Sequence, residues 1–138
     1  MITTHHEGAF LIALVAAFAE AAGDTVSSEI GQWISGRAYL ITTFQPVPAG
    51  ENGGVSAGGS LAGTAASTLV VALALALGLC GTGGAFIALA GAVGGNVLDS
   101  VLGATIERRG LVTNAIVNFT GTSFAGAVAL AVALHLGF

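Results

Sequence analysis

Four long stretches, apolar over most of their length, divide the chain, and each predicts a helix that crosses a membrane. They lie at about residues 8–30, 56–79, 85–106 and 114–136, and a polar loop at residues 32–55 separates the first two. A helix needs roughly 20 residues to cross about 30 Å of hydrocarbon. The pattern therefore predicts an all-α integral membrane protein, a single membrane domain over residues 1–138 with about four transmembrane helices.

The composition supports this class. Hydrophobic residues make up 54% of the 138 residues, charged residues only 7%, and 22 residues are glycine; the mean hydropathy is +0.92. Glycine and alanine let apolar helices approach closely in lipid. The net charge of −4 and the presence of only three arginines and no lysine argue against a nucleic-acid partner, because no basic face is available to neutralise phosphates.

Polar residues gather on one side of the predicted bundle. If the first helix ends on that side, the second begins there, the third returns there, and the fourth begins there as well. The three arginines, Arg37, Arg108 and Arg109, then all lie on the same side, which the positive-inside rule identifies as cytoplasmic. We therefore expect an integral membrane protein with its polar site at the cytoplasmic side.

Acidic residues at this side predict a metal site. Asp24, Glu29 and Asp99 offer the oxygen ligands that Mg²⁺ prefers. In proteins this ion is usually held by one or two carboxylates together with substrate phosphates and water. Glu20 and Asp24 share a helix face, whereas Glu29 points elsewhere. Asp24 and Glu29 can reach one ligand only if the helix bends or ends between them, and Gly23 is a possible place. The alternative is a structural role, as partners of arginine or as helix caps.

A glycine-rich segment before the second apolar stretch predicts a phosphate site. Backbone donors that precede a helix N-terminus favour anions, and an arginine can clamp phosphoryl oxygens. The expected nucleotide- and phosphate-binding residues are Arg37, Asn52, Gly53, Gly54 and Ser56.

In the fourth apolar stretch, Asn114, Asn118 and Thr122 stack at intervals of four residues. The second stretch carries Gly59, Gly63 and Ser67 at the same spacing, which predicts a face for close packing.

These segments together resemble a known family, the phytyl-phosphate kinases of vitamin E synthesis and their transmembrane protein 19 relatives. The resemblance rests on Asp24-Thr25-x-x-Ser28-Glu29-Ile30-Gly31, Leu40-Ile41-Thr42-Thr43, Pro46-Val47-Pro48-x-Gly50-x-Asn52-Gly53-Gly54-Val55-Ser56, Gly63-Thr64-x-Ala66-Ser67, Asp99-Ser100-x-Leu102-Gly103-Ala104-Thr105 and Asn114-x-x-Val117-Asn118-Phe119. More distantly, the chain is similar to dolichol kinase and to CDP-lipid synthases.

The resemblance implies an Mg²⁺-dependent lipid-phosphate kinase. It would transfer a phosphoryl group from a nucleoside triphosphate, with CTP as the expected donor, to an isoprenoid monophosphate such as phytyl phosphate. Asp24, Glu29 and Asp99 would be the catalytic and metal-binding residues, and Asn114 and Asn118 would orient the lipid phosphate. Members of the family are usually longer, with further N-terminal helices.

Two other functions fit the same residues. One is nucleotidyl transfer, which forms a CDP-lipid from the same substrates. The other is a non-enzymatic cation channel or transporter subunit, with the acids at its mouth.

We also expect a homo-oligomer, most simply a dimer. A second copy would pack on Ala13, Ala16, Ala17 and Ala21 of the first stretch and on Gly121, Gly126 and Ala129 of the fourth.

Overall fold

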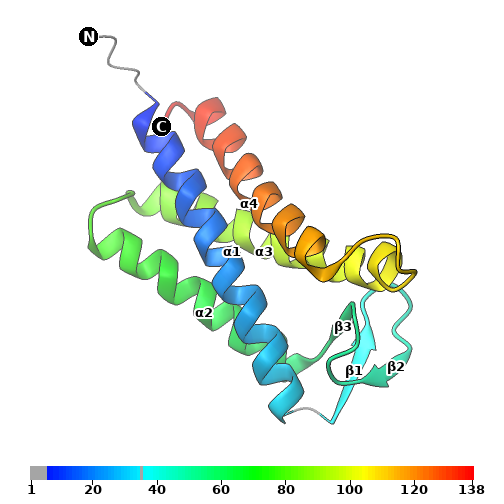
Figure 1. The fold of residues 1–138 in the computed structure, drawn as a ribbon. Coiled ribbons are helices and arrows are strands. Elements are labelled where there is room, and N and C mark those ends of the chain that lie inside the picture. The colour runs from blue at the N-terminus through cyan, green and yellow to red at the C-terminus, as the bar shows by residue number, and fades with distance from the viewer. Residues whose placement is uncertain (1–5, 35) are drawn as a thin grey trace.

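The computed structural model describes residues 6–34 and 36–138 and contains four long helices and a small sheet (Figure 1). In chain order the elements are α1 (Glu7–Ile34), β1 (Arg37–Leu40), β2 (Pro46–Pro48), β3 (Gly54–Val55), α2 (Ala57–Ala76), α3 (Thr82–Leu102), the π-helical turn η1 (Gly103–Glu107) and α4 (Asn114–Leu136). Four helical segments are long and apolar enough to cross a membrane, and η1 extends the third of them to Glu107. The predicted number and approximate positions of the membrane helices are confirmed.

Helix α1 is continuous, so the bend or end considered at Gly23 does not occur. Gly23 instead allows three helices to meet. A Cβ atom at this position would lie 2.2 Å from Ser67 Oγ of α2 and 2.8 Å from Asn96 Nδ2 of α3. The glycine is therefore required for the close approach of α2 and α3 to α1. The helix also runs past the expected boundary at residue 30, as far as Ile34.

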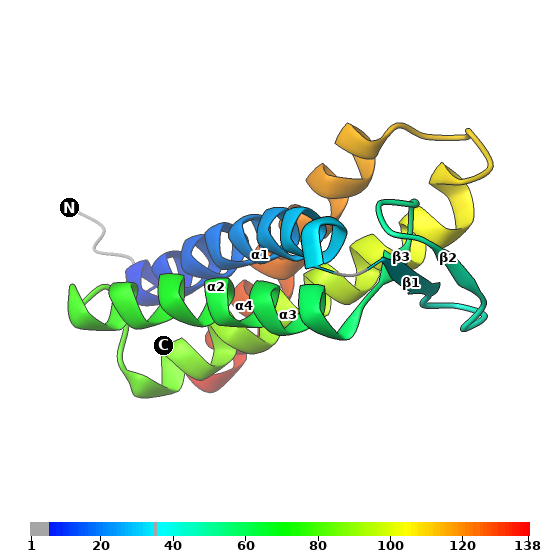
Figure 2. The same cartoon turned by 90° about the horizontal axis from the view of Figure 1, so that it is seen from below.

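The loop between α1 and α2 contains a three-stranded antiparallel sheet, which the all-helical expectation did not include. The strand order is β2-β1-β3, with Tyr39 opposite Pro46 on one side and Val55 on the other. Pro46 and Pro48 lie on β2, an edge strand, where the missing backbone N–H groups cost no ladder hydrogen bond. Both views place this sheet at one end of the bundle, next to the end of α3 (Figures 1 and 2).

Small residues of α2 form a close-packing face, as the sequence predicts, and the structure shows that its partner is α1. A Cβ atom on Gly59 would lie 2.6 Å from the Ser27 carbonyl oxygen, and one on Gly63 would lie 2.6 Å from the Gly23 carbonyl oxygen. The buried Ser67 hydroxyl donates a hydrogen bond of 2.8 Å to the Ala19 carbonyl. The backbones of the two helices are therefore almost in contact along this face.

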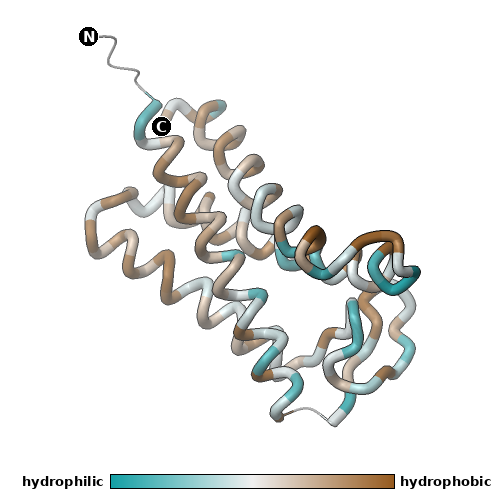
Figure 3. Tube along the Cα trace, viewed as in Figure 1, coloured by the Kyte–Doolittle hydropathy of each residue, from teal (hydrophilic) through white to brown (hydrophobic). Residues whose placement is uncertain are grey.

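Large apolar side chains lie on the outside of the molecule and small ones inside. The fully buried core residues are mostly alanine, among them Ala16, Ala88 and Ala129, whereas Phe18 and Leu61 are exposed by 63% and 76%. Figure 3 shows apolar residues along the whole length of the helices, and polar ones concentrated towards the sheet. Such a surface would aggregate in water but suits a lipid environment.

The surfaces proposed for a second copy are mostly used inside the chain. Ala16 and Ala129 are completely buried, and a Cβ atom on Gly126 of α4 would lie 3.3 Å from the Ala13 carbonyl oxygen of α1. These residues hold α1 and α4 of one chain together, so most of the surface chosen from the sequence is not available to a second copy, although Ala21 is exposed. The dimer itself stays a prediction.

Candidate functional site

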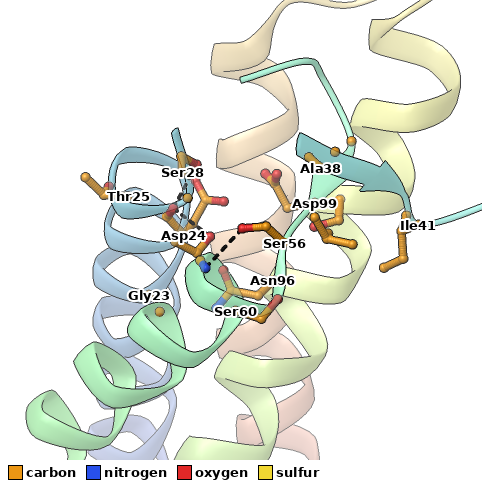
Figure 4. A pocket seen from close by; sticks show the side chains of 18 of the residues that line it. Gly23, Asp24, Thr25, Ser28, Ala38, Ile41, Ser56, Ser60, Asn96 and Asp99 are labelled. Atoms are coloured by element: carbon orange, nitrogen blue, oxygen red, sulfur yellow. Dashed lines mark hydrogen bonds between the residues drawn. The ribbon is translucent and has the colours of Figure 1, made fainter. Parts of the chain in front are cut away.

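A polar pocket opens at the end of the bundle that carries the sheet. Its volume is about 540 Å³, and it is lined by α1, the loops around the sheet, the first half of α2, the end of α3 and the start of α4. Figure 4 shows side chains from α1, α2 and α3, including Asp24, Ser56, Asn96 and Asp99, around this space. The polar ends of the membrane helices therefore converge as the sequence predicts.

The structure brings together every predicted site residue except Arg37. The pocket is lined by Asp24, Glu29, Asn52, Gly53, Gly54, Ser56, Asp99, Asn114 and Asn118. Asp24 and Glu29 both reach it from an unbroken helix, because one side of α1, from Gly23 to Gln32, forms a wall of the pocket. Arg37 is exposed at the start of β1 and does not line the pocket.

Acidic side chains dominate the charge of the pocket. Five of them line it, from Asp24, Glu29, Glu51, Asp99 and Glu107, and the lining residues include no lysine, arginine or histidine. Carboxylates in one confined space repel each other unless a cation or bound protons offset the charge. This donor set fits a hard cation such as Mg²⁺.

The acids do not form a closed metal cage. In residues 6–34 and 36–138 there is no group of three or more histidine, cysteine, aspartate or glutamate side chains that could hold one metal ion. Asp24, Glu29 and Asp99 are thus not gathered into a three-ligand set. The geometry fits the other mode of Mg²⁺ binding, in which one or two carboxylates act together with phosphate oxygens and water.

Asp99 is held in place by α4. It is only 9% exposed. When the Asn118 amide is turned so that its nitrogen faces acceptors, it donates to Asp99 Oδ2 at 3.2 Å and to the Asn114 carbonyl at 3.1 Å. The expected role of Asn118 was to orient a lipid phosphate. In this structure the Asn118 amide contacts the neighbouring Asp99 carboxylate, and its role towards a lipid phosphate stays a prediction.

The glycine-rich segment has a packing role that the sequence did not predict. Gly53 has a φ of +74°, and a Cβ atom there would lie 2.1 Å from the Ala104 backbone nitrogen in η1. The Gly54 N–H donates to the Glu51 carbonyl at 2.9 Å, so this donor is already used. Ser56 caps α2, with its hydroxyl accepting a hydrogen bond of 3.1 Å from the Gly59 N–H.

Arg108 forms an ion pair with Glu51 at the rim of the pocket. Arg108 Nη1 is 3.7 Å from Glu51 Oε2, and both side chains are nearly half exposed. This is the one ion pair in the part of the chain that the structure describes. It links the loop before β3 to the residue that follows η1.

Glu20 is a buried acid that the sequence analysis did not assign to the site. Its side chain is 1% exposed. Oε2 accepts a hydrogen bond of 2.5 Å from the Thr122 hydroxyl, and Oε1 has no hydrogen-bond partner among the described residues. The sequence contained two signals for this contact: Glu20 shares a face with Asp24, and Thr122 continues the line of Asn114 and Asn118. Charged groups inside a membrane domain usually mark functional regions.

Four membrane-spanning helices around an acidic pocket define an integral membrane protein with a polar site at one end of the bundle. The chain belongs to a family described as "Integral membrane protein DUF92", whose model matches residues 1–126.

Three relatives are similar to most of the chain. It is 37% identical over 119 residues to "Uncharacterized membrane protein sll0875" of Synechocystis sp., covering 86% of this chain and 46% of the relative. It is 34% identical over 124 residues to "Uncharacterized membrane protein MJ0933" of Methanocaldococcus jannaschii, covering 86% and 49%. It is 39% identical over 113 residues to "Protein PGR" of Arabidopsis thaliana, covering 72% and 39%.

None of these three names states an activity. The chain spans less than half the length of the three relatives, at 46%, 49% and 39%. No solved structure matches it.

Proposed function

We propose that this chain forms the reaction pocket of a metal-dependent lipid-phosphate kinase. The reaction is transfer of the terminal phosphoryl group of a nucleoside triphosphate, with CTP as the expected donor, to an isoprenoid monophosphate such as phytyl phosphate. The observation that carries the proposal is the pocket itself, with five acids and no basic residue among its lining, at the end of four membrane helices.

Such a pocket suits phosphoryl transfer only when cations accompany the substrates. A nucleoside triphosphate and a lipid phosphate are both anionic, and the acids would repel them. Asp24 and Asp99, on facing walls, would hold Mg²⁺, which supplies neutralisation of phosphate charge. Catalysis of this kind consists mainly of positioning and electrostatic stabilisation.

The remaining lining residues have roles that follow from their positions. The Asn52 amide and the N-terminus of α2 lie where donor phosphates would be oriented. Asn114 and Asn118, at the start of α4, lie on the Asp99 side, where the lipid phosphate would be held. An oxygen of that phosphate attacks the terminal phosphorus, the bond to the bridging oxygen breaks, and the nucleoside diphosphate leaves with the electron pair.

The test uses the chain in nanodiscs with phytyl monophosphate, MgCl₂ and CTP labelled at either the γ or the α phosphate. Label from the γ position in the lipid product supports the kinase. Label from the α position in the lipid indicates the rival, a nucleotidyltransferase that forms a CDP-lipid. No transfer of either label contradicts both enzymatic proposals for this chain.

The channel alternative receives less support from the fold. The core that fills the far half of the bundle is apolar and includes Ile12, Val15, Val71 and Ala88, so no polar path continues from the pocket through the described residues of one chain. An ion path would need several copies.

Two further expectations have their own tests. Mass measurement in nanodiscs tests the proposed dimer. Protection of the pocket residues from labelling at the outer surface of cells tests the proposed cytoplasmic orientation.

A further inference from the structure

The pocket is not confined to the polar end of the bundle. Along α2 its lining extends from Ser56 to Ser67, a distance of about 16 Å at 1.5 Å per residue. Along α3 it reaches down to Val93. Both helices are long and apolar enough to cross a membrane, so we expect part of the pocket to lie at the depth of the hydrocarbon.

This deep part opens sideways between α2 and α3. The two helices are joined at the far end of the bundle and diverge towards the sheet, with α1 crossing over both (Figure 1). Val93 and Val97 line the pocket and are still 42% and 49% exposed. Thr64, on the α2 side, is exposed as well. Side chains that both line a pocket and face outward mark its mouth.

The chemistry of the mouth differs from that of the polar end of the pocket next to the sheet. The Thr64 hydroxyl donates to the Ser60 carbonyl of its own helix at 2.8 Å, and the Ser67 hydroxyl donates to the Ala19 carbonyl. Neither needs a polar ligand. Val93 and Val97 opposite give the outer edge of the groove an apolar surface. Asn96, between them on α3, also lines the pocket, and its buried Oδ1 has no hydrogen-bond partner among the described residues, whereas the acids lie towards the sheet.

We propose that the groove between α2 and α3, edged by Thr64, Val93 and Val97, is a lateral portal that holds the first units of an isoprenoid tail. The phosphate of the same lipid lies above, near Asp99, and the rest of the tail continues into the bilayer. This inference rests on the proposed function for the identity of the lipid. Because the groove opens to lipid, the protein contacts only the proximal part of the tail.

A second apolar groove provides the competing location. It lies between α3 and α4, is lined by Phe86, Ile87, Ala90, Gly91, Val128, Ala129 and Val132, and has a volume of about 300 Å³. None of these residues lines the polar pocket. A tail anchored by a phosphate in the pocket would therefore not be expected there.

The first experiment maps the tail without requiring turnover. The chain in nanodiscs is irradiated with a prenyl monophosphate that carries a diazirine on its second isoprene unit, with and without excess unlabelled prenyl monophosphate. We expect competed crosslinks on α2 and α3 near Thr64, Val93 and Val97. Competed crosslinks in the Phe86–Val132 groove, or none that compete, would overturn the portal. This readout is independent of whether phosphoryl transfer occurs, so the portal can fail while the kinase stands, and the reverse.

The second experiment narrows the mouth. Val97→Trp should raise the KM for a long-chain prenyl phosphate by about tenfold or more, because steric exclusion from an apolar site discriminates on that scale. The KM for CTP should not change, and the KM for dimethylallyl phosphate, whose single unit fills only part of the groove, should rise less than that for the long-chain substrate. Leu61→Trp is the matched control, since Leu61 is exposed on α2 and does not line the pocket. Equal effects of both variants, or none for Val97→Trp, would contradict the portal.

Discussion

The two ends of the helix bundle contain different kinds of side chain. At the far end, alanine and a few branched residues fill the space between helices, with Ala9, Ala88 and Ala133 completely buried. At the other end α2 and α3 diverge, and acids, asparagines and the sheet surround an open pocket. Close packing at one end therefore holds the helices in position while they separate at the other.

This difference predicts that the stability of the protein depends mainly on the far end and its activity mainly on the pocket end. Contacts at the far end involve small residues with no room for an added group, so changes there should affect folding. Residues at the pocket end are polar and partly exposed, so changes there should affect binding and turnover. Four predictions test this division, in order of decreasing effect.

The largest effect is expected from Asp99→Asn, and similarly from Asp24→Asn. Either change removes one carboxylate from the pocket while changing side-chain volume little. Phosphoryl transfer should fall by at least about 100-fold, because metal affinity and the positioning of phosphates depend on the ligand charge. Turnover is measured with γ-labelled CTP, and folding by thermal unfolding in detergent. The matched control is Glu7→Gln, at the exposed start of α1. Near-normal turnover in both variants would remove the acids from the mechanism.

The second prediction concerns the far end. Ala88→Leu inserts a large side chain where the exposed fraction is 0%, and it should destabilise the bundle by about 1–3 kcal/mol. Activity per folded molecule should be unchanged. Ala90→Leu on the same helix faces outward and serves as the control. Loss of activity without loss of stability in Ala88→Leu would show that the two ends are coupled.

The sequence predicts the membrane helices and the meeting of their polar ends, because these follow from hydropathy and from counting spans. It also predicts that Gly59 and Gly63 belong to a close-packing face, since small residues at four-residue spacing have one main use in lipid, but it does not identify α1 as the partner helix. The small sheet was missed because its strands are of two to four residues, too short to show an alternating pattern.

Other features depend on tertiary contacts that no local pattern encodes. Gly23 suggested a bend, but its neighbours Ser67 and Asn96 come from distant parts of the chain. Arg37 was assigned from its charge and its loop, whereas β1 places it away from the pocket. Glu107 was not assigned to the site. The π-helical turn brings it to the pocket lining, and such turns are not recognisable from sequence.

The third prediction separates two roles of Gly53. Gly53→Ala introduces a side chain at positive φ and against the backbone of Ala104. It should displace the loop and raise the KM for CTP by about threefold to tenfold, because a small misplacement of binding groups is costly. Gly78→Ala is the control, since Gly78 has a φ of +72° with nothing within 4 Å of its would-be Cβ. That change should carry only the cost of backbone strain, about 1 kcal/mol. Equal effects on the KM in both variants would mean that the contact with η1 does not position the pocket.

The smallest effect is expected at the rim, where Arg108 and Glu51 form a half-exposed ion pair at 3.7 Å. Exposed pairs of this kind contribute less than about 1 kcal/mol, so Arg108→Gln should change thermal stability little and turnover less than about twofold. Turnover and stability are measured as above, with Arg109→Gln as the control for loss of a neighbouring charge. Arg108 is, however, the described cation closest in sequence to the acidic pocket wall at Glu107. A large rise in the KM for CTP in Arg108→Gln alone would show that its guanidinium exchanges Glu51 for a phosphate when the nucleotide binds. The rim would then belong to the reacting end of the molecule, and the pocket would include a cation that its unliganded lining does not contain.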